Sequence, residues 1–154
     1  MTRIVFEDVS KIDGDRPCQV QEAMALLRQN VPSDEIFART GCRVGLRRIS
    51  LEIPEGGIFC VIGLSGSGKS TLVRHINRLI EPSCGRIQAC DIDVTALDAR
   101  GLREFRRARV SMVFQHFGLL PHLTVMQNTC FGLRVRGLSA KEQRERACHW
   151  LREM

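Results

Sequence analysis

The chain has 154 residues, of which 44% are hydrophobic and 26% charged, a composition that fits one globular domain and excludes a disordered segment. Its 23 basic and 17 acidic residues give a net charge of +6, which fits acidic partners such as nucleotides, nucleic acid or an anionic membrane surface. No apolar stretch approaches the roughly 20 residues of a membrane-spanning helix. The N-terminus carries acidic residues where a secretory signal has its apolar core, so we expect a cytoplasmic protein.

The first third of the chain predicts two strands with two helices between them. Residues 3–10 form a short β-like run, and a loop rich in turn formers follows at 11–17. Helical spacing predicts one helix over about 19–30 and another that begins near Ser33 and stops at Gly41. Residues 46–53 alternate between apolar and polar side chains, which is typical of a half-buried strand.

The rest of the chain predicts alternating strands and helices. Residues 58–62 are apolar on both faces and predict an interior strand of a parallel sheet. A Gly/Ser loop and a helix that ends at Glu81-Pro82 follow it. Further along we expect a short strand at 86–89 and an Arg-rich helix at 98–108. A second apolar strand follows at 110–114, and a last helix begins with a capping box at 139.

Seven cysteines, at positions 18, 42, 60, 84, 90, 130 and 148, form no Cys-x-x-Cys pair. The sequence therefore predicts neither a disulfide framework nor a zinc site, and we interpret the cysteines as buried small residues in a reducing compartment. The four histidines share no metal-ligand spacing, so we expect no metal site built on histidine.

The strongest chemical signal is a glycine-rich loop that matches the phosphate-binding pattern G-x-x-x-x-G-K-[S/T]. It consists of Gly63, Leu64, Ser65, Gly66, Ser67, Gly68, Lys69 and Ser70, followed by Thr71. Glycines let successive backbone N–H groups point at phosphate oxygens, and the helix that follows adds its positive dipole end. Lys69 would neutralise phosphate charge, and the Ser70 hydroxyl would bind Mg²⁺. The alternative interpretation is a purely structural glycine-rich turn between strand and helix.

Two further groups are weaker signals. Gln115 follows the predicted strand at 110–114, from which its amide could reach a metal ion or an attacking water; position alone favours a solvated loop residue. Arg100, Arg103, Arg106, Arg107 and Arg109 form a basic cluster. Because no set of stacking aromatic residues accompanies them, the cluster favours a solvated helix face over nucleic-acid binding.

Two sequence blocks, GLSGSGKSTLVRHINRLIEPSCGRI and VSMVFQHFGLLPHLTVMQNTCFGL, resemble the nucleotide-binding subunit of ABC transporters. An earlier block, ALLRQN with SDEIFARTGCRVGLRRISLEIPEGGIF, is similar to the subfamily for glycine betaine/proline and choline uptake, whose ATPase carries a helical insertion there. The resemblance implies an α/β fold, a partial P-loop NTPase core. It divides the chain into a small antiparallel β-subdomain at 1–57, with the insertion at about 17–41, and a core at 58–154.

The same resemblance implies site residues and partners. It assigns ATP to the loop Gly63–Thr71, with Lys69 on the phosphates and with Ser70 and Gln115 on Mg²⁺. Leu119, Pro121 and His122 lie where the family docks on the membrane permease subunits. The implied assembly contains a second ATPase subunit, contains no nucleic acid, and is peripheral on the inner face of the cell membrane.

The chain also departs from the family pattern. Asp13 stands where the family has an aromatic residue that stacks on adenine, and such stacking contributes about 1–3 kcal/mol per base. The 154 residues contain no LSGG-type signature, no Walker B acid with its following glutamate and no switch histidine. Because such positioned groups supply most of the acceleration in phosphoryl transfer, we expect weak nucleotide binding and negligible hydrolysis by this chain alone.

Several functions remain open from the sequence. The first is the ATP-binding part of an importer for an osmoprotectant such as glycine betaine, proline betaine or choline. The second is a non-hydrolysing relic or regulatory fragment that holds nucleotide or docks on a permease. A nucleic-acid-binding domain built on the arginine cluster is a third, and a small P-loop kinase, for which the chain offers no base or lid, is a fourth.

Overall fold

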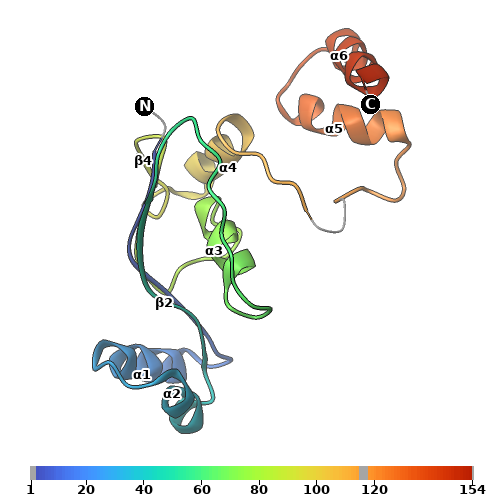
Figure 1. Cartoon of the computed structure of the whole chain (residues 1–154). Coiled ribbons are helices and arrows are strands. Elements are labelled where there is room, and N and C mark those ends of the chain that lie inside the picture. The colour runs from blue at the N-terminus through green and yellow to red at the C-terminus, as the bar shows by residue number, and fades with distance from the viewer. Residues whose placement is uncertain (1–2, 115–117, 154) are drawn as a thin grey trace. The chain divides into compact units, whose positions relative to one another are not determined.

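The computed structural model describes residues 3–114 and 118–153, and the chain divides into two compact units, Met1–Leu102 and Arg103–Met154. The first unit combines a β-sheet with helices, and the second is helical (Figure 1). The elements are β1 (Ile4–Asp13), α1 (Pro17–Arg28), α2 (Ser33–Thr40), β2 (Arg43–Ile53), α3 (Lys69–Ile76), β3 (Cys84–Ala89), β4 (Ile92–Asp93), α4 (Ala99–Ala108), α5 (Val125–Val135) and α6 (Ala140–Glu153).

The sheet has the strand order β2-β1-β3-β4, and each neighbouring pair is antiparallel. β1 pairs with β2 from Ile4↔Ile53 to Asp13↔Arg43, with register shifts along the way. At one shift Asp8 has a φ of 50°, and its N–H turns to the Ser50 hydroxyl at 3.0 Å. This bulge lets one long strand serve two neighbours while it bends.

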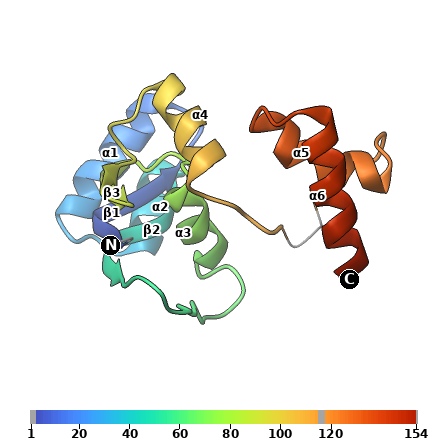
Figure 2. The same ribbon diagram turned by 90° about the horizontal axis from the view of Figure 1, so that it is seen from above.

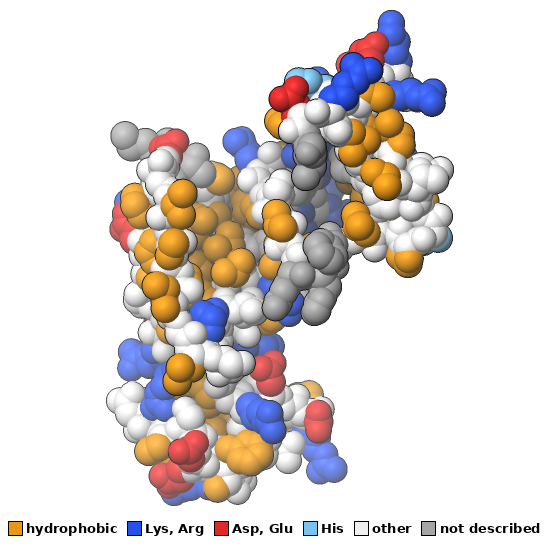
Figure 3. All heavy atoms as spheres, turned by 45° about the vertical axis from the view of Figure 1, so that its right-hand side comes forward, with side chains coloured by type: hydrophobic (Ala, Val, Ile, Leu, Met, Phe, Trp, Pro, Cys, Tyr) orange, Lys and Arg blue, Asp and Glu red, His pale blue; other side chains and the backbone are white. Residues whose placement is uncertain are grey.

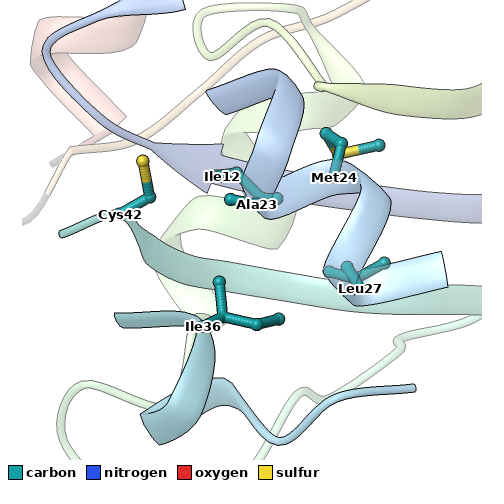
Figure 4. Close-up of a cluster of buried hydrophobic side chains, with 6 residues drawn as sticks. All are labelled: Ile12, Ala23, Met24, Leu27, Ile36 and Cys42. Atoms are coloured by element: carbon teal, nitrogen blue, oxygen red, sulfur yellow. The ribbon is translucent and has the colours of Figure 1, made fainter. Parts of the chain in front are cut away.

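The two helices predicted between the first strands are confirmed, and they enclose a core of their own. α1 contributes Ala23, Met24 and Leu27 at helical spacing, and α2 contributes Ile36, which is fully buried. Figure 4 shows how these side chains gather with Ile12 of β1 and with Cys42. The end of α2 before Gly41 is also as predicted. The insertion is therefore held on the sheet by buried apolar side chains.

α3 packs on the sheet beside this core (Figure 2). Its Leu72 and Ile76 contact a second buried cluster made of Phe6, Val9 and Ile87. Because the two α3 residues are four positions apart, they lie on one face of the helix. The sheet thus fixes α3, whose first residues belong to the glycine-rich loop.

The second unit contains two helices that begin with capping boxes. At α6, the box predicted from the sequence is present: Ser139 N–H donates to Glu142 Oε2 at 3.0 Å, and Glu142 N–H donates to Ser139 Oγ at 3.3 Å. At α5, Thr124 and Gln127 make the same reciprocal pair. α5 was not among the predicted helices, although Thr124-x-x-Gln127 is itself a capping-box pattern.

The two predicted parallel strands are wrong. Residues 58–62 and 110–114 form no strand, and Ile58, Ile62 and Val113 are 97%, 92% and 96% exposed. A strand needs a partner for its backbone N–H and C=O groups, and none of the strands in the described part of the chain pairs with either segment. Figure 3 shows hydrophobic side chains gathered at the surface of the first unit.

Smaller expectations are also corrected. β1 continues through residues 11–13, which we expected in a loop, because β2 supplies partners as far as Asp13. α3 ends at Ile76, before Glu81-Pro82, and Arg78 just beyond it has a positive φ of 50°. Of the seven cysteines, Cys42 is buried, Cys18 and Cys60 are exposed, and the other four are partly exposed, so the interpretation of the cysteines as buried is confirmed for Cys42 alone. Among the described helices none is long and apolar enough to span a membrane.

Candidate functional site

The glycine-rich loop leads directly into α3. Gly68 is the N-cap of the helix, and its carbonyl accepts the N–H of Leu72 at 2.8 Å. Lys69 is therefore the first helical residue, with Ser70 and Thr71 in the first turn. The backbone N–H groups of this turn have no partner within the helix, which makes the turn a suitable position for an anion.

Close packing explains glycine at two positions of the loop. Gly68 has a φ of +88°, and a Cβ there would lie 2.7 Å from the carbonyl oxygen of Gly45 on β2. A Cβ on Gly63 would lie 2.7 Å from the Ser67 hydroxyl. The loop therefore folds back on itself and presses against β2 at a distance that side chains would prevent.

The ammonium group of Lys69 lies inside the curve of the loop. Its Nζ donates to the carbonyl oxygens of Gly63 at 2.8 Å and Leu64 at 2.6 Å, and it lies 3.5 Å from Ser67 Oγ. These contacts place a positive charge beside the first turn of α3. A phosphate group bound at that turn would be within reach of the same ammonium.

A pocket of about 180 Å³ opens at this point, lined by Gly45, Gly66, Ser67, Gly68, Lys69, Ser70 and Thr71. Gly63, Leu64 and Ser65 of the predicted loop do not line it. Gly45 was not among the predicted site residues, although a glycine inside a strand often marks the close approach of another backbone. The structure thus gathers six of the nine predicted nucleotide-binding residues, together with Gly45, around one small pocket.

Asp13, at the end of β1, borders this site. Its Oδ2 would lie 3.3 Å from a Cβ on Gly45, and its Oδ1 lies 3.5 Å from Lys11 Nζ. The Asp13 side chain is 62% exposed. The border of the pocket next to Gly45 therefore carries a carboxylate with an ammonium partner.

His75 is buried one turn behind the loop. Its side chain is 0% exposed, and its Nδ1 lies 2.6 Å from the carbonyl oxygen of Thr71. Because the carbonyl can only accept, Nδ1 carries the proton of the neutral ring. The Nε2 atom has no hydrogen-bond partner among the described residues. Burial lowers the pKa of His75, and the bond to Thr71 only partly opposes this.

The predicted docking residues lie in the second unit, just before α5. Leu119, which is 66% exposed, and Pro121 line an apolar pocket of about 300 Å³ together with Leu120, Leu123, Val125, Asn128 and Thr129. His122 is exposed but does not line the pocket. Gln115 lies outside the described residues.

The other sequence signals show no convergent site. Over residues 3–114 and 118–153, no group of three or more His, Cys, Asp or Glu side chains could hold a metal ion. Within the arginine cluster, Arg107 donates to the carbonyl oxygen of Arg136 at 2.6 Å and pairs with Glu104 at 4.0 Å. This arginine therefore connects helix α4 to the residue that follows α5.

The fold and the glycine-rich loop together identify the class of protein to which the chain belongs. The chain is α/β and forms part of a P-loop NTPase core of the ABC ATPase type. It superposes with a TM-score of 0.75 on an ATP-binding cassette solved as a dimer bound to ADP and Pi, with 27% identity, covering 97% of this chain and 56% of that one. A sequence model described as ABC transporter matches residues 46–154. The chain therefore belongs to the ABC transporter family.

Curated relatives show which kind of ABC transporter this chain is similar to. The chain is 42% identical over 152 residues to the glycine betaine/proline betaine transport system ATP-binding protein of Escherichia coli, covering 99% of this chain and 37% of that protein. It is 43% identical to the glycine betaine transport ATP-binding protein of Bacillus subtilis, covering 97% of this chain and 35% of that protein. The chain thus spans about a third of the length of the curated relatives it matches.

Proposed function

We propose that this chain is the N-terminal portion of the ATP-binding component of an ABC importer for osmoprotectants of the glycine betaine, proline or choline type. The observation that carries the proposal is the pocket lined by residues 66–71, which include the first turn of α3, with the Lys69 ammonium beside that turn. The names of the E. coli and B. subtilis relatives support the class of transported solute.

The loop residues fit nucleotide phosphates. The exposed N-terminus of α3 offers backbone N–H donors, Lys69 adds a full positive charge, and Gly68 could not be replaced by a larger residue without a clash with Gly45. Bound Mg²⁺ would neutralise phosphate charge, and we assign the Ser70 hydroxyl and Gln115 to it. We also propose that the chain divides into a β-subdomain at 1–57, with the helical insertion at about 17–41, and a core at 58–154.

We further propose that the segment with Leu119, Pro121 and His122 docks on the permease subunits of the importer, and that a second ATPase subunit completes the assembly. Exposed apolar side chains around the 300 Å³ pocket support docking, because burying them would be favourable. The assembled protein would then be peripheral on the inner face of the cell membrane.

Calorimetric titration of the 154-residue chain with Mg-ATP tests the nucleotide site, with phosphate release followed in parallel. We expect saturable binding, at least tenfold weaker binding by Lys69→Ala, and negligible phosphate release by either. Lys141→Ala, at an exposed lysine on α6, is the matched control and should bind like the unmodified chain. Equal binding by Lys69→Ala and the unmodified chain would refute the site.

Phosphate release that depends on Lys69 would instead show that this chain hydrolyses ATP. Binding without release fits the second function considered above, a fragment that holds nucleotide or docks on a permease. Titration of the permease subunit of the E. coli glycine betaine/proline betaine system, in detergent micelles, then tests docking. Leu119→Asp should weaken that binding at least tenfold.

A further inference from the structure

One side chain in the second unit bonds to the backbone of three residues just before α5. Asn128 is the fourth residue of α5, and its amide group points back toward residues 120–124. Its Oδ1 accepts the N–H of Leu120 at 2.8 Å, and its Nδ2 lies 3.1 Å from the Leu120 carbonyl oxygen. Both backbone groups of Leu120 are therefore bonded to one amide, in a closed ring of two hydrogen bonds.

The same Nδ2 also lies 3.1 Å from each of the carbonyl oxygens of Leu123 and Thr124. Leu123 N–H closes the turn on Leu120 O at 3.0 Å. An amide combines N–H donors with an acceptor oxygen, and Asn128 uses both on this turn: Oδ1 accepts from Leu120 N–H, and Nδ2 faces three carbonyl oxygens. No shorter or charged side chain could make the same set, because it would lack either the donors or the acceptor.

We propose that Asn128 is the positioning residue of the docking surface: it fixes the turn at 120–123 and thereby sets Leu119 and Pro121 around the apolar pocket. The inference rests on the docking role proposed above for this segment. Asn128 itself lines the pocket, next to Leu120 and Leu123. A surface that is already ordered loses less conformational entropy when a partner binds, so the amide strengthens docking without making the main apolar contact.

Three variants of the 154-residue chain separate positioning from general damage to the helix. Asn128→Ala removes all four contacts, and Asn128→Asp keeps an acceptor for Leu120 N–H but turns an oxygen toward three carbonyl oxygens. Gln127→Ala is the matched control, because it breaks the neighbouring capping-box bond to Thr124 N–H at 2.9 Å and leaves the Asn128 contacts in place.

The first measurement is amide hydrogen exchange at Leu120, read by NMR in the 154-residue chain. We expect exchange at least tenfold faster in Asn128→Ala, and little change in Gln127→Ala. The second is binding to the E. coli permease subunit in detergent micelles, which we expect to weaken at least tenfold in both Asn128 variants. Mg-ATP affinity should stay within twofold in all three variants, which shows that the first unit is intact.

The possible results separate the positioning role of Asn128 from the docking proposal on which it rests. Docking by Asn128→Ala as tight as that of the unmodified chain overturns the positioning role and leaves the docking proposal standing. Equal weakening by Gln127→Ala also overturns it, because helix stability would then explain the effect. Failure of the unmodified chain to dock, with Mg-ATP still bound, overturns the docking proposal itself and the positioning role with it.

Discussion

The insertion core and the segment before the glycine-rich loop contain similar side chains in opposite environments. In the insertion core, Ile36 and Leu27 are almost completely buried between α1, α2 and the sheet. In the segment at 58–62, Ile58 and Ile62 are almost completely exposed. Both stretches have the residues of a buried element, and only one has partners within the described chain.

The difference shows what an apolar run can and cannot specify. The insertion closes on itself because α1 and α2 are near neighbours in sequence and pack against β1 and β2, which pair with each other. An interior strand has two neighbours and two covered faces, all of which come from distant parts of a sequence. Burial of the run at 58–62 therefore depends on partners that the described residues do not supply.

The largest expected effect comes from replacing isoleucine by alanine at one site in each region. Ile36→Ala should lower the free energy of unfolding by about 2–5 kcal/mol, because it leaves a cavity in a closed core. Ile62→Ala, at a side chain that is 92% exposed, should change it by less than about 0.5 kcal/mol. Urea denaturation followed by circular dichroism measures both. A loss at Ile62 as large as that at Ile36 would show that residues 58–62 are buried in solution.

A second test compares two glycines within the loop. Gly68→Ala should destabilise the chain by about 1–3 kcal/mol, because it combines a positive φ with a Cβ placed 2.7 Å from Gly45 O. Gly66 also has a positive φ, of +80°, but a Cβ there meets nothing within 4 Å. Gly66→Ala should therefore cost only the backbone strain, about 1–2 kcal/mol. The same denaturation assay applies, and equal losses would mean that the loop does not press on β2.

Several elements could be predicted from local patterns. In the first unit these are the helices at 17–28 and 33–40 and the strand that ends at Ile53, and in the second unit the capping box at Ser139. Each is specified by residues that lie close together in the sequence. The two parallel strands could not be predicted reliably, because their existence depends on partners far away in sequence. The start of α5 is also encoded locally, since Thr124 and Gln127 have the spacing of a capping box.

The candidate site likewise combines residues that could be predicted from the sequence with residues that could not. The loop Gly63–Thr71 is a contiguous motif, so its position before a helix follows from the sequence alone. Gly45 and Asp13 come from two different strands and meet the loop only through the pairing of β1 with β2. Asn128 likewise reaches the docking segment only because α5 folds back on it, a contact for which the residue type gives no signal.

The smallest effect concerns His75, a buried residue of the helix that follows the loop. The folded chain holds its ring neutral because burial lowers its pKa, whereas the unfolded chain binds a proton near the ordinary value of about 6.5. Below that pH the unfolded state takes up a proton that the folded state does not, so stability falls as the pH falls below about 6.5. At pH 7.5 neither state is protonated, and the effect vanishes.

Charged groups near His75 act in both directions: Lys11 lowers its pKa, while Asp13 and Glu81 raise it. Urea denaturation at pH 7.5, 6.5 and 5.5 should therefore show a loss of stability that is smaller in His75→Leu than in the unmodified chain. His149→Leu, at an exposed histidine of α6, controls for the change in composition and should keep the full loss. An identical pH dependence for His75→Leu and the unmodified chain would mean that His75 is reached by water. In that case the helix that follows the loop would not be packed on the sheet in solution, and the buried core of the first unit would not include it.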